Sequence, residues 1–456
     1  MPRVKFGADG IRGTAGEWPW IPSIVVRIGQ ALGQSACRRS GRPLVAIGRD
    51  TRPSGESLSH CLVAGLTGQG ANVIDLGVIT TPGVAFLTQN LCADLGVMVS
   101  ASHNPLEYNG IKLVGPNGLR LRDKEESEIE NLINKFVSST GAEYATKLGQ
   151  QTYNRHLAGL YIQDHVKQCL ARSPEGLKVV LDCANGAASR IAPEVFSQLG
   201  AEVVAVNASG GDINYYCGSE HVREHPQDLV KVMQRHRVGY GFAFDGDGDR
   251  LVIVNSKGKV FDGNDLLFIL AKELLKEGDT VVTIHSANRG LEEALSLSGI
   301  RTVYTDNGDK NIEREMWGSG YLLGGEPGGN IIINDGHHTA ADAIYTALVI
   351  GGMLARDQHA NLEKMVAPLQ KRPQVTVSSR VPSPFTPKQR AILNNQIRRL
   401  ERDLGEDSRI MLHDSGTEPG VVRVMVEGGC AGVLEKVSKT ADAICQIVQQ
   451  VASSKD

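Results

Sequence analysis

The sequence has few aromatic residues and no apolar run long enough to cross a bilayer. Aromatic residues make up only 5% of its 456 residues. The longest apolar stretch, from Ala343 to Ala355, is shorter than the roughly 20 residues that a transmembrane helix needs, and polar residues and a Gly-Gly pair interrupt it. The opening residues, Met1 to Asp9, contain no apolar segment of the signal-peptide type. We therefore expect a soluble protein with no membrane partner.

The sequence also lacks paired cysteines and an excess of either charge. Its eight cysteines include no C-x-x-C, which disfavours a thiolate zinc site or a redox pair and is typical of a reduced, cytoplasmic protein. The 48 Lys and Arg residues nearly balance 51 Asp and Glu residues, leaving a net charge of −3. A nucleic acid partner is therefore not expected, and a small polar ligand fits better. Glycine is abundant, with 52 residues, which predicts many tight turns or close approaches to a ligand.

The length and the hydrophobic pattern predict several domains. At about 150 residues per domain, 456 residues correspond to about three domains, and a fourth small one also fits. From Leu44 to Leu113, short β-branched runs alternate with helical segments, and the same rhythm restarts at Lys178 and at Thr280. This pattern predicts three similar α/β domains with mixed sheets covered on both faces, related as a diverged internal repeat.

The last part of the chain has a different pattern. It predicts strands over 374–380, 409–412 and 421–427, a helix over 388–404, and a closing helix with apolar residues three and four apart. We therefore expect a C-terminal α+β domain. The predicted domains cover residues 1–150, 151–255, 256–370 and 371–456.

The most specific chemical feature is a run of three aspartates between two predicted strands. Asp245, Asp247 and Asp249 alternate with glycines, so their carboxylates can converge when the backbone curls. Three converging negative charges repel one another unless a hard divalent cation offsets them. An EF-hand loop needs Gly at its sixth position and Glu at its twelfth, where this chain has Arg250 and Ser256, so Mg²⁺ is the better prediction.

A second polar turn follows the predicted strand that ends at Val99. It contains Ser102 and His103, whose side chains could point out at the sheet edge. Ser, His, Asn and Pro are also ordinary turn residues, so this pair alone is weak evidence for a nucleophile. The chain has no G-x-S-x-G elbow, Walker A loop or complete G-x-G-x-x-G fingerprint, which lowers hydrolase, P-loop and dinucleotide-binding interpretations.

Three glycine-rich segments complete the set of candidate site motifs. Residues 415–420, with Arg423 just beyond, offer backbone N–H groups, hydroxyls and a cation that could bind a phosphate, or they form an ordinary hairpin turn. Residues 7–13 could bring Arg12 to an anion, and residues 324–330 contain Glu326. His285, His337 and His338 lie near no interpretable motif, and we expect surface or loop histidines there.

The order of these motifs resembles the α-D-phosphohexomutase family. FGADGIRG (residues 6–13), SASHNP (100–105), NGIK (109–112), DGDGDR (245–250), GGE (324–326) and SGTEP (415–419) follow one another over nearly the whole chain. The first and last motifs are most similar to those of the members that interconvert glucosamine 6-phosphate and glucosamine 1-phosphate. Activity on mannose or glucose phosphates is the close alternative, and a sugar-phosphate-binding protein that has lost turnover is a more distant one.

The resemblance implies four domains around one active-site cleft, and it implies a role for each motif. Ser102 is the implied phosphorylated residue. Asp245, Asp247 and Asp249, with an oxygen of phosphorylated Ser102, are the implied Mg²⁺ ligands, and a hexose 1,6-bisphosphate is the implied intermediate. The residues implied in phosphoryl transfer are Arg12, His103, Lys112 and Arg250. Those implied in sugar-phosphate binding are Glu326, Ser415, Gly416, Thr417 and Arg423. The chain departs from the usual family pattern at Gly328, Asn330 and His413.

Overall fold

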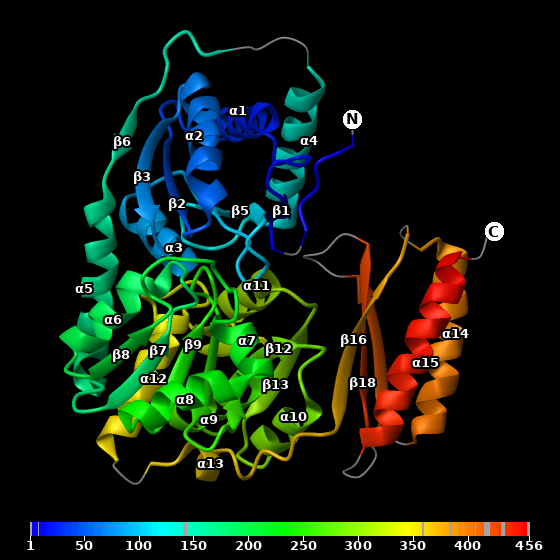
Figure 1. Cartoon of the computed structure of the whole chain (residues 1–456). Helices are drawn as coiled ribbons and strands as arrows, with labels where there is room; N and C mark the ends of the chain where they lie inside the picture. The colour runs from blue at the N-terminus through cyan, green and yellow to red at the C-terminus, as the bar shows by residue number, and fades with distance from the viewer. Residues whose placement is uncertain are drawn as a thin grey trace.

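The computed structural model contains three α/β units and a smaller C-terminal unit (Figure 1). It describes residues 2–7, 9–139, 144–357, 360–382, 385–405, 407–414, 420–429 and 434–453. In Figure 1 the first unit (blue) lies above the second and third (green to yellow), and the C-terminal unit (orange to red) stands beside them. Within these residues, no helix combines the length and the apolar character needed to cross a bilayer.

The first unit is a six-stranded mixed sheet with helices on both faces. Successive residues of its central strands enter different cores, with Val45 and Ile47 in one cluster and Ala46 in another, as expected for strands buried on both sides. Pro53 begins α2, and Thr80 caps α3 by accepting a hydrogen bond from the Gly83 N–H. The elements are β1 (Ile11–Thr14), α1 (Pro22–Arg39), β2 (Leu44–Arg49), α2 (Pro53–Gly68), β3 (Asn72–Val78), α3 (Thr81–Asn90), β4 (Leu95–Val99), β5 (Tyr108–Val114), α4 (Asp123–Ser138) and β6 (Gln151–Tyr153).

The second unit is a five-stranded sheet in the order β11-β10-β9-β7-β8. Its strands are short and rich in Val, Ile and Phe, and β10 is buried throughout. The elements are α5 (Ala158–Cys169), β7 (Lys178–Asp182), α6 (Ala188–Gln198), β8 (Glu202–Val206), α7 (Gly218–Glu224), α8 (Pro226–His236), β9 (Tyr240–Phe244), β10 (Leu251–Asn255) and β11 (Val260–Phe261), with 3-10 turns at Arg155–Leu157 and Leu170–Arg172.

The third unit has a four-stranded sheet in the order β13-β12-β14-β15. Asp262, Asn288 and Asp342 cap its helices α9, α10 and α12 by accepting hydrogen bonds from first-turn N–H groups. The elements are α9 (Gly263–Leu274), β12 (Thr280–Ile284), α10 (Arg289–Ser296), β13 (Arg301–Thr305), α11 (Asp309–Ser319), β14 (Leu323–Gly325), β15 (Ile331–Ile333), α12 (Ala343–Arg356) and α13 (Leu362–Met365).

The same four-strand topology occurs in all three α/β units, which confirms the predicted repeat. In each unit the first strand runs parallel to the second and to the third, and the third turns back into an antiparallel fourth. The sets are β2-β3-β4-β5, β7-β8-β9-β10 and β12-β13-β14-β15. The turns between the third and fourth strands contain Ser102, the aspartate run and Glu326 respectively. The repeat therefore gives every unit one equivalent turn with a candidate site residue.

Two sheets extend past the residues at which the sequence pattern ends a domain. β6 pairs with β3 just after residue 150, because the connecting chain runs along the free edge of the first sheet. β11 pairs with β10 after residue 255, because the chain turns back through Gly258 to form a further antiparallel strand. β6 lacks the apolar pattern of a buried strand, and β11 is only two residues long.

The C-terminal unit has the predicted α+β form. Its antiparallel sheet, in the order β16-β18-β17, is covered by two helices on one face, and Val437, Ala441 and Ile444 of α15 are buried against it. The elements are β16 (Gln374–Arg380), α14 (Pro387–Leu404), β17 (Arg409–Asp414), β18 (Val421–Glu427) and α15 (Leu434–Ser453). In Figure 1 the helices face away from the other units and the sheet faces toward them.

Candidate active site

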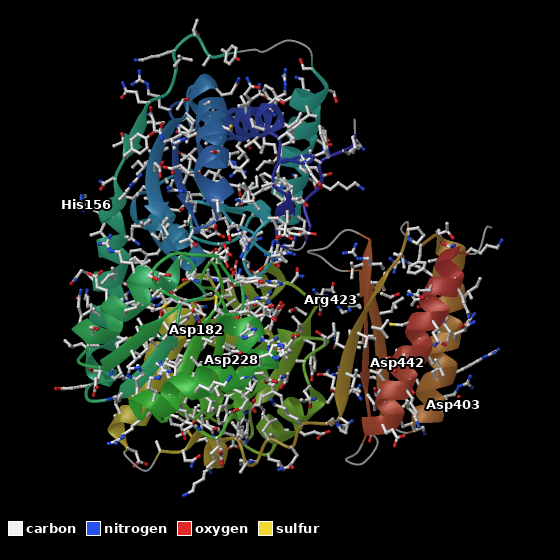
Figure 2. All side chains as sticks on the ribbon, viewed as in Figure 1. His156, Asp182, Asp228, Asp403, Arg423 and Asp442 are labelled. Carbon is white, nitrogen blue, oxygen red and sulfur yellow. The ribbon has the colours of Figure 1, made fainter. Side chains whose placement is uncertain are left out.

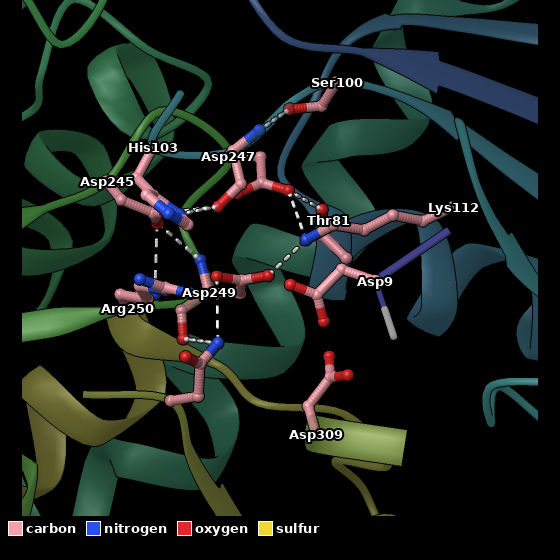
Figure 3. A network of polar contacts seen from close by, with 12 residues as sticks. Asp9, Thr81, Ser100, His103, Lys112, Asp245, Asp247, Asp249, Arg250 and Asp309 are labelled. Atoms are coloured by element: carbon pink, nitrogen blue, oxygen red, sulfur yellow. Dashed lines mark hydrogen bonds and ion pairs between the residues drawn. The ribbon is translucent and has the colours of Figure 1, made fainter. Parts of the chain in front are cut away.

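The equivalent turns of the three α/β units meet at one cavity. Ser102 comes from the first unit, Asp249 from the second and Glu326 from the third, although the sequence separates them widely. Figure 3 shows the network of polar contacts around the three aspartates. The residues that line the cavity are Asp9, Arg12, Ser102, Lys112, Asp249, Arg250, Asp309, Glu326 and Asn330.

Ser102 is buried at the tip of the first turn, with its hydroxyl directed at the aspartates. Its backbone is left-handed, with φ of 52°, which turns the side chain away from the direction of the preceding strand. Its Oγ donates a hydrogen bond to Asp245 Oδ2 at 2.6 Å and lies 3.2 Å from His103 Nδ1. A non-glycine residue in this backbone region is held by its surroundings, and such strain is common at functional sites.

The turn around Ser102 is held by Arg52, a residue that sequence reasoning missed. The Arg52 guanidinium is buried, pairs with Asp50 at 3.0 Å, and donates to the carbonyl oxygens of Ser102, Asn104 and Tyr108 at 2.8, 2.7 and 2.9 Å. Because one rigid cation binds several carbonyls of the same turn, the position of the Ser102 hydroxyl is fixed before any ligand binds.

The three aspartates converge as the alternating glycines predict. All three are buried, and one ligand oxygen from each lies within 4.8 Å of the others. Asp245 Oδ1 accepts hydrogen bonds from the N–H groups of Asp249 and Arg250, both at 3.1 Å, which curls the turn. Burial and the charges of Asp249 and Asp247 raise the pKa of Asp245 well above its usual range.

Lys112 offsets part of this negative charge. Its Nζ lies 2.6 Å from Asp249 Oδ2 and 2.8 Å from Asp247 Oδ2, and the latter oxygen also accepts from Thr81 Oγ1 at 2.5 Å (Figure 3). Burial alone raises the pKa of Asp247, but Lys112 and Thr81 hold it below its usual value. Across the part of the chain that the structure describes, the other oxygen of Asp247 is buried without a hydrogen-bond partner. This donor set of carboxylate oxygens fits a hard divalent cation.

The third turn brings a carboxyl group with a raised pKa to the cavity. Glu326 Oε1 accepts a hydrogen bond from the Gly308 N–H at 3.0 Å. Burial, with the charges of Asp9 and Asp309, raises the pKa of Glu326 to about 7. A group with this pKa can accept or release a proton near neutral pH.

Asn330, at a position where the chain departs from the family pattern, contacts the aspartate turn. Its Nδ2 donates to Asp249 Oδ1 at 3.0 Å. This contact was not predicted, because the sequence pattern placed residue 330 in the sugar loop alone. Asn330 therefore connects the third turn to a candidate metal ligand.

The cations expected at the site surround the serine turn. Arg12 donates to Asn104 at 2.7 Å and pairs with Asp9 at 3.3 Å, while Arg250 pairs with Glu220 at 2.8 Å. Burial, and then the charges of Arg250 and Arg12, lower the pKa of His103 well below its usual value, so its imidazole is neutral. Arg12, Lys112 and Arg250 therefore line the same cavity as the acidic residues.

The C-terminal unit contributes its cations from the side that faces the other units. Figure 2 shows Arg423 there, and the strand register places His413 opposite Arg423. The charge of Arg423 helps to lower the pKa of His103, so it acts across the gap between the units. The predicted phosphate-binding residues Ser415, Gly416 and Thr417 lie outside the described residues.

Known proteins of one family match this chain along most of its length. Alpha/beta/alpha domains I, II and III of phosphoglucomutase/phosphomannomutase match residues 3–139, 155–258 and 262–372. The phosphoglucosamine mutase of Geobacillus thermodenitrificans is 39% identical over 449 residues, which cover 95% of this chain and 97% of that protein. The chain belongs to the phosphoglucomutase/phosphomannomutase family.

Further relatives support membership of the phosphoglucomutase/phosphomannomutase family. The phosphoglucosamine mutase of Clostridioides difficile is 36% identical over 459 residues, covering 99% of this chain and 100% of that protein. A phosphoglucomutase/phosphomannomutase family protein of Burkholderia thailandensis has the same fold, with a TM-score of 0.80, 23% identity and coverage of 99% and 98% of the two chains. Aspergillus fumigatus N-acetylphosphoglucosamine mutase, solved with GlcNAc-6P and magnesium, matches with a TM-score of 0.63 at 16% identity over 99% and 96%.

Membership of the phosphoglucomutase/phosphomannomutase family confirms the predicted fold class and the prediction that the chain is an enzyme. It is a phosphohexomutase with three α/β domains and a further C-terminal domain. The residues that sequence reasoning missed at the site are Asp9, Asp50, Arg52, Thr81, Glu220 and Asp309. Of these, only Asp9 lies within a quoted motif.

Proposed function

We propose that this chain interconverts glucosamine 6-phosphate and glucosamine 1-phosphate through a phosphorylated serine. The relatives named phosphoglucosamine mutase, 36% to 40% identical, support this substrate. The observation that carries the proposal is the 2.6 Å hydrogen bond from Ser102 Oγ to Asp245, inside a buried cluster of three carboxylates. A serine with a structural role alone does not need three carboxylates beside its hydroxyl. A serine that carries a phosphoryl group next to a bound cation does need them.

The proposed reaction transfers one phosphoryl group in each direction. The bond between phosphorus and Ser102 Oγ breaks as a free sugar hydroxyl forms a new bond to phosphorus, and the hydroxyl proton passes to Glu326. Ser102 Oγ is left as the alkoxide. The resulting hexose 1,6-bisphosphate reorients in the cavity, Ser102 Oγ forms a bond to its other phosphorus, and the sugar oxygen released from that phosphorus takes the proton back from Glu326. Arg12, Lys112 and Arg250 stabilise the charge on the equatorial oxygens of the transferring group.

The proposed metal ligands are Asp245, Asp247 and Asp249, with an oxygen of phosphorylated Ser102. The support is the buried unpartnered oxygen of Asp247, among the described residues, and the raised pKa of Asp245. When bound, Mg²⁺ withdraws electron density from the phosphate and stabilises its charge during transfer. Thr81 and Asn330 orient two of the ligand carboxylates from outside the cluster.

We assign the substrate's own phosphate to the C-terminal unit. The assignment rests on the family pattern at Ser415, Gly416 and Thr417 and on the position of Arg423 on the side of the C-terminal unit that faces the other units. In this arrangement the sugar ring lies between Glu326 and the serine turn. We also propose that the four units are domains with the predicted boundaries, except that the first domain includes β6 and the second includes β11.

A panel of sugar phosphates tests the substrate. Each of glucosamine 6-phosphate, N-acetylglucosamine 6-phosphate, glucose 6-phosphate and mannose 6-phosphate is assayed with its 1,6-bisphosphate present. We expect kcat/KM for glucosamine 6-phosphate to exceed the others by at least about tenfold, a difference of about 1.4 kcal/mol in transition-state binding. Faster turnover of glucose or mannose phosphate contradicts the assignment. Binding without turnover of any sugar indicates the sugar-phosphate-binding alternative.

The raised pKa of Glu326 predicts a pH dependence. Its carboxylate accepts a proton only when ionised, so kcat/KM should rise with pH up to a pKa of about 7 and then level off. Glu326→Gln should lower kcat by roughly 10²-fold and remove this inflection, leaving only that of the substrate phosphate. Glu107→Gln, at an exposed position near the serine turn, serves as the matched control. An unchanged inflection in Glu326→Gln shows that another group accepts the proton.

A further inference from the structure

A second cluster of histidines and aspartates lies away from the active-site cavity. Asp164 and His165 come from α5 in the second unit, and His338 comes from the loop between β15 and α12 in the third. One ligand atom from each lies within 4.8 Å of the others. Of the histidines expected at surface or loop positions, His337 is exposed, but His338 is only 5% exposed.

Nδ1 of each histidine lies against a protein oxygen, and Nε2 of His338 has no hydrogen-bond partner among the described residues, whereas Nε2 of His165 lies beside Asp342. His165 Nδ1 lies 3.0 Å from the carbonyl oxygen of Tyr161, which can only accept a hydrogen bond. His338 Nδ1 lies 3.4 Å from Asp335, and the other oxygen of Asp335 accepts from Tyr345 Oη at 2.5 Å. A carbonyl or carboxylate on the second ring nitrogen is the usual arrangement around metal-binding histidines, because it fixes the tautomer and the direction of the ring.

Two buried atoms at the centre of the cluster have no hydrogen-bond partner among the described residues. His338 Nε2 and Asp164 Oδ2 lie 3.8 Å apart, and both are buried without a hydrogen-bond partner among the described residues. His165 Nε2 lies 3.1 Å from Asp342 Oδ2, an oxygen that already accepts from Tyr161 Oη at 2.5 Å. Unpaired buried polar atoms are costly, so their convergence points to a ligand.

The charges in the cluster favour a cation. Three carboxylates, those of Asp164, Asp335 and Asp342, lie beside the two histidines. A divalent ion can offset the charge of such carboxylates.

We propose that Asp164, His165 and His338 bind a second metal ion, and that this ion is Zn²⁺. Two imidazole nitrogens and one carboxylate oxygen suit a borderline divalent ion rather than Mg²⁺, which prefers oxygen ligands. Asp342, next to His165 Nε2, or a water can complete a tetrahedral set. A small cavity that includes His338, Asp342 and Phe86 in its lining lies beside the cluster.

The position of this site gives the ion a structural role in holding the units together. It links α5 of the second unit to a loop of the third, and Thr339 in that loop donates to the Gly118 carbonyl of the first unit at 2.9 Å. Just beyond the loop, the Ala343 N–H donates to the Gly248 carbonyl of the aspartate turn at 3.3 Å. An ion at this point therefore fixes the three units whose turns form the active-site cavity.

Zn²⁺ binding by the full chain tests the proposal. The chelator-treated protein is titrated with Zn²⁺ in excess Mg²⁺, which occupies the aspartate turn. The readouts are bound zinc per chain, the melting temperature, and the visible absorption of Co²⁺ as a substitute. We expect one Zn²⁺ per chain, with a rise in melting temperature that saturates at this ratio. Failure of the wild-type chain to bind Zn²⁺ overturns the proposal.

Matched variants locate the site. His338→Gln and Asp164→Asn should each abolish the Zn²⁺-dependent rise in melting temperature and the Co²⁺ absorption, while His337→Gln, at the exposed neighbouring position, should retain both. Asp335→Asn removes the charge behind His338 and should weaken Zn²⁺ binding by roughly 10- to 100-fold. Circular dichroism confirms that each variant is folded, and Asp164, at the partly exposed edge of the cluster, is the least disruptive position. Zn²⁺ binding by His338→Gln with wild-type affinity contradicts the proposed site.

Discussion

Ser102→Ala should reduce turnover by at least roughly 10⁴-fold, because the proposed reaction loses the atom that carries the phosphoryl group between its two transfers. The Ser102 hydroxyl lies 2.6 Å from Asp245 and is held by the backbone contacts of Arg52, so no neighbouring hydroxyl can take its place without a rearrangement of the turn. The measurements are steady-state turnover with glucosamine 6-phosphate and the intact mass of the protein. The mass of the wild type should show one added phosphoryl group that the variant lacks.

A second serine provides the control for this experiment. Ser59 in α2 is also buried, and within the described ranges its hydroxyl makes no hydrogen bond. Ser59→Ala should therefore keep both full turnover and the added mass. If Ser102→Ala retains the added mass, or turns over at more than about a tenth of the wild-type rate, another residue carries the phosphoryl group and the proposed mechanism is wrong.

The sequence predicted those parts of the site that depend on local chain geometry. Aspartates that alternate with glycines between two apolar strands can converge within one turn, so the close approach of Asp245, Asp247 and Asp249 follows from neighbouring residues alone. The strands, helices and α/β repeat also follow from patterns over short windows. The pairing of His413 with Arg423 was not predictable in this way, because it depends on the register of β17 against β18.

The contacts that sequence reasoning missed join residues far apart in the chain. Thr81 and Asp247 are 166 positions apart, Asn330 and Asp249 are 81 apart, and Arg52 lies 50 positions before the serine that it holds. None of the three supporting residues lies in a motif that predicts its role, because an Arg or Thr at a helix start is common. Packing of units against each other brings Thr81 and Asn330 to the aspartate turn, whereas the pairing of β2 with β4 inside the first sheet brings Arg52 to the serine turn.

The repeated topology explains why the site could be assembled at all. Each α/β unit turns back after its third strand, and the chain places one reacting group in each of these turns: a hydroxyl, a set of carboxylates and a carboxyl with a raised pKa. Packing the units so that the turns meet combines these groups in one cavity. The proposed Zn²⁺ site lies in the same junction, where a cation can maintain that arrangement without taking part in the reaction.

Asp245→Asn should have opposite effects on activity and on the stability of the metal-free protein. The change removes one proposed Mg²⁺ ligand and should lower turnover by roughly 10³-fold. It also removes a buried carboxylate that Asp249 and Asp247 repel, which should raise the stability of the metal-free protein above that of the wild type. The hydrogen bonds can be kept, because Asn retains Oδ1 for the two backbone N–H groups and the Ser102 hydroxyl can rotate to accept from the amide.

Asp182, labelled in Figure 2, is the control with the opposite expected sign. It is also buried, but both of its oxygens accept hydrogen bonds from N–H groups, of Ala184, Asn207 and Gly218, at 3.0 to 3.1 Å. Asp182→Asn places an amide donor against one of these and should cost about 1 to 3 kcal/mol. Thermal unfolding in chelator should therefore give the highest melting temperature for Asp245→Asn, a lower one for the wild type and the lowest for Asp182→Asn.

Added Mg²⁺ should raise the melting temperature of the wild type but not of Asp245→Asn, because a cluster built to hold a cation is least stable without one. Equal destabilisation by the two variants shows that Asp245 is a structural acceptor and not a metal ligand.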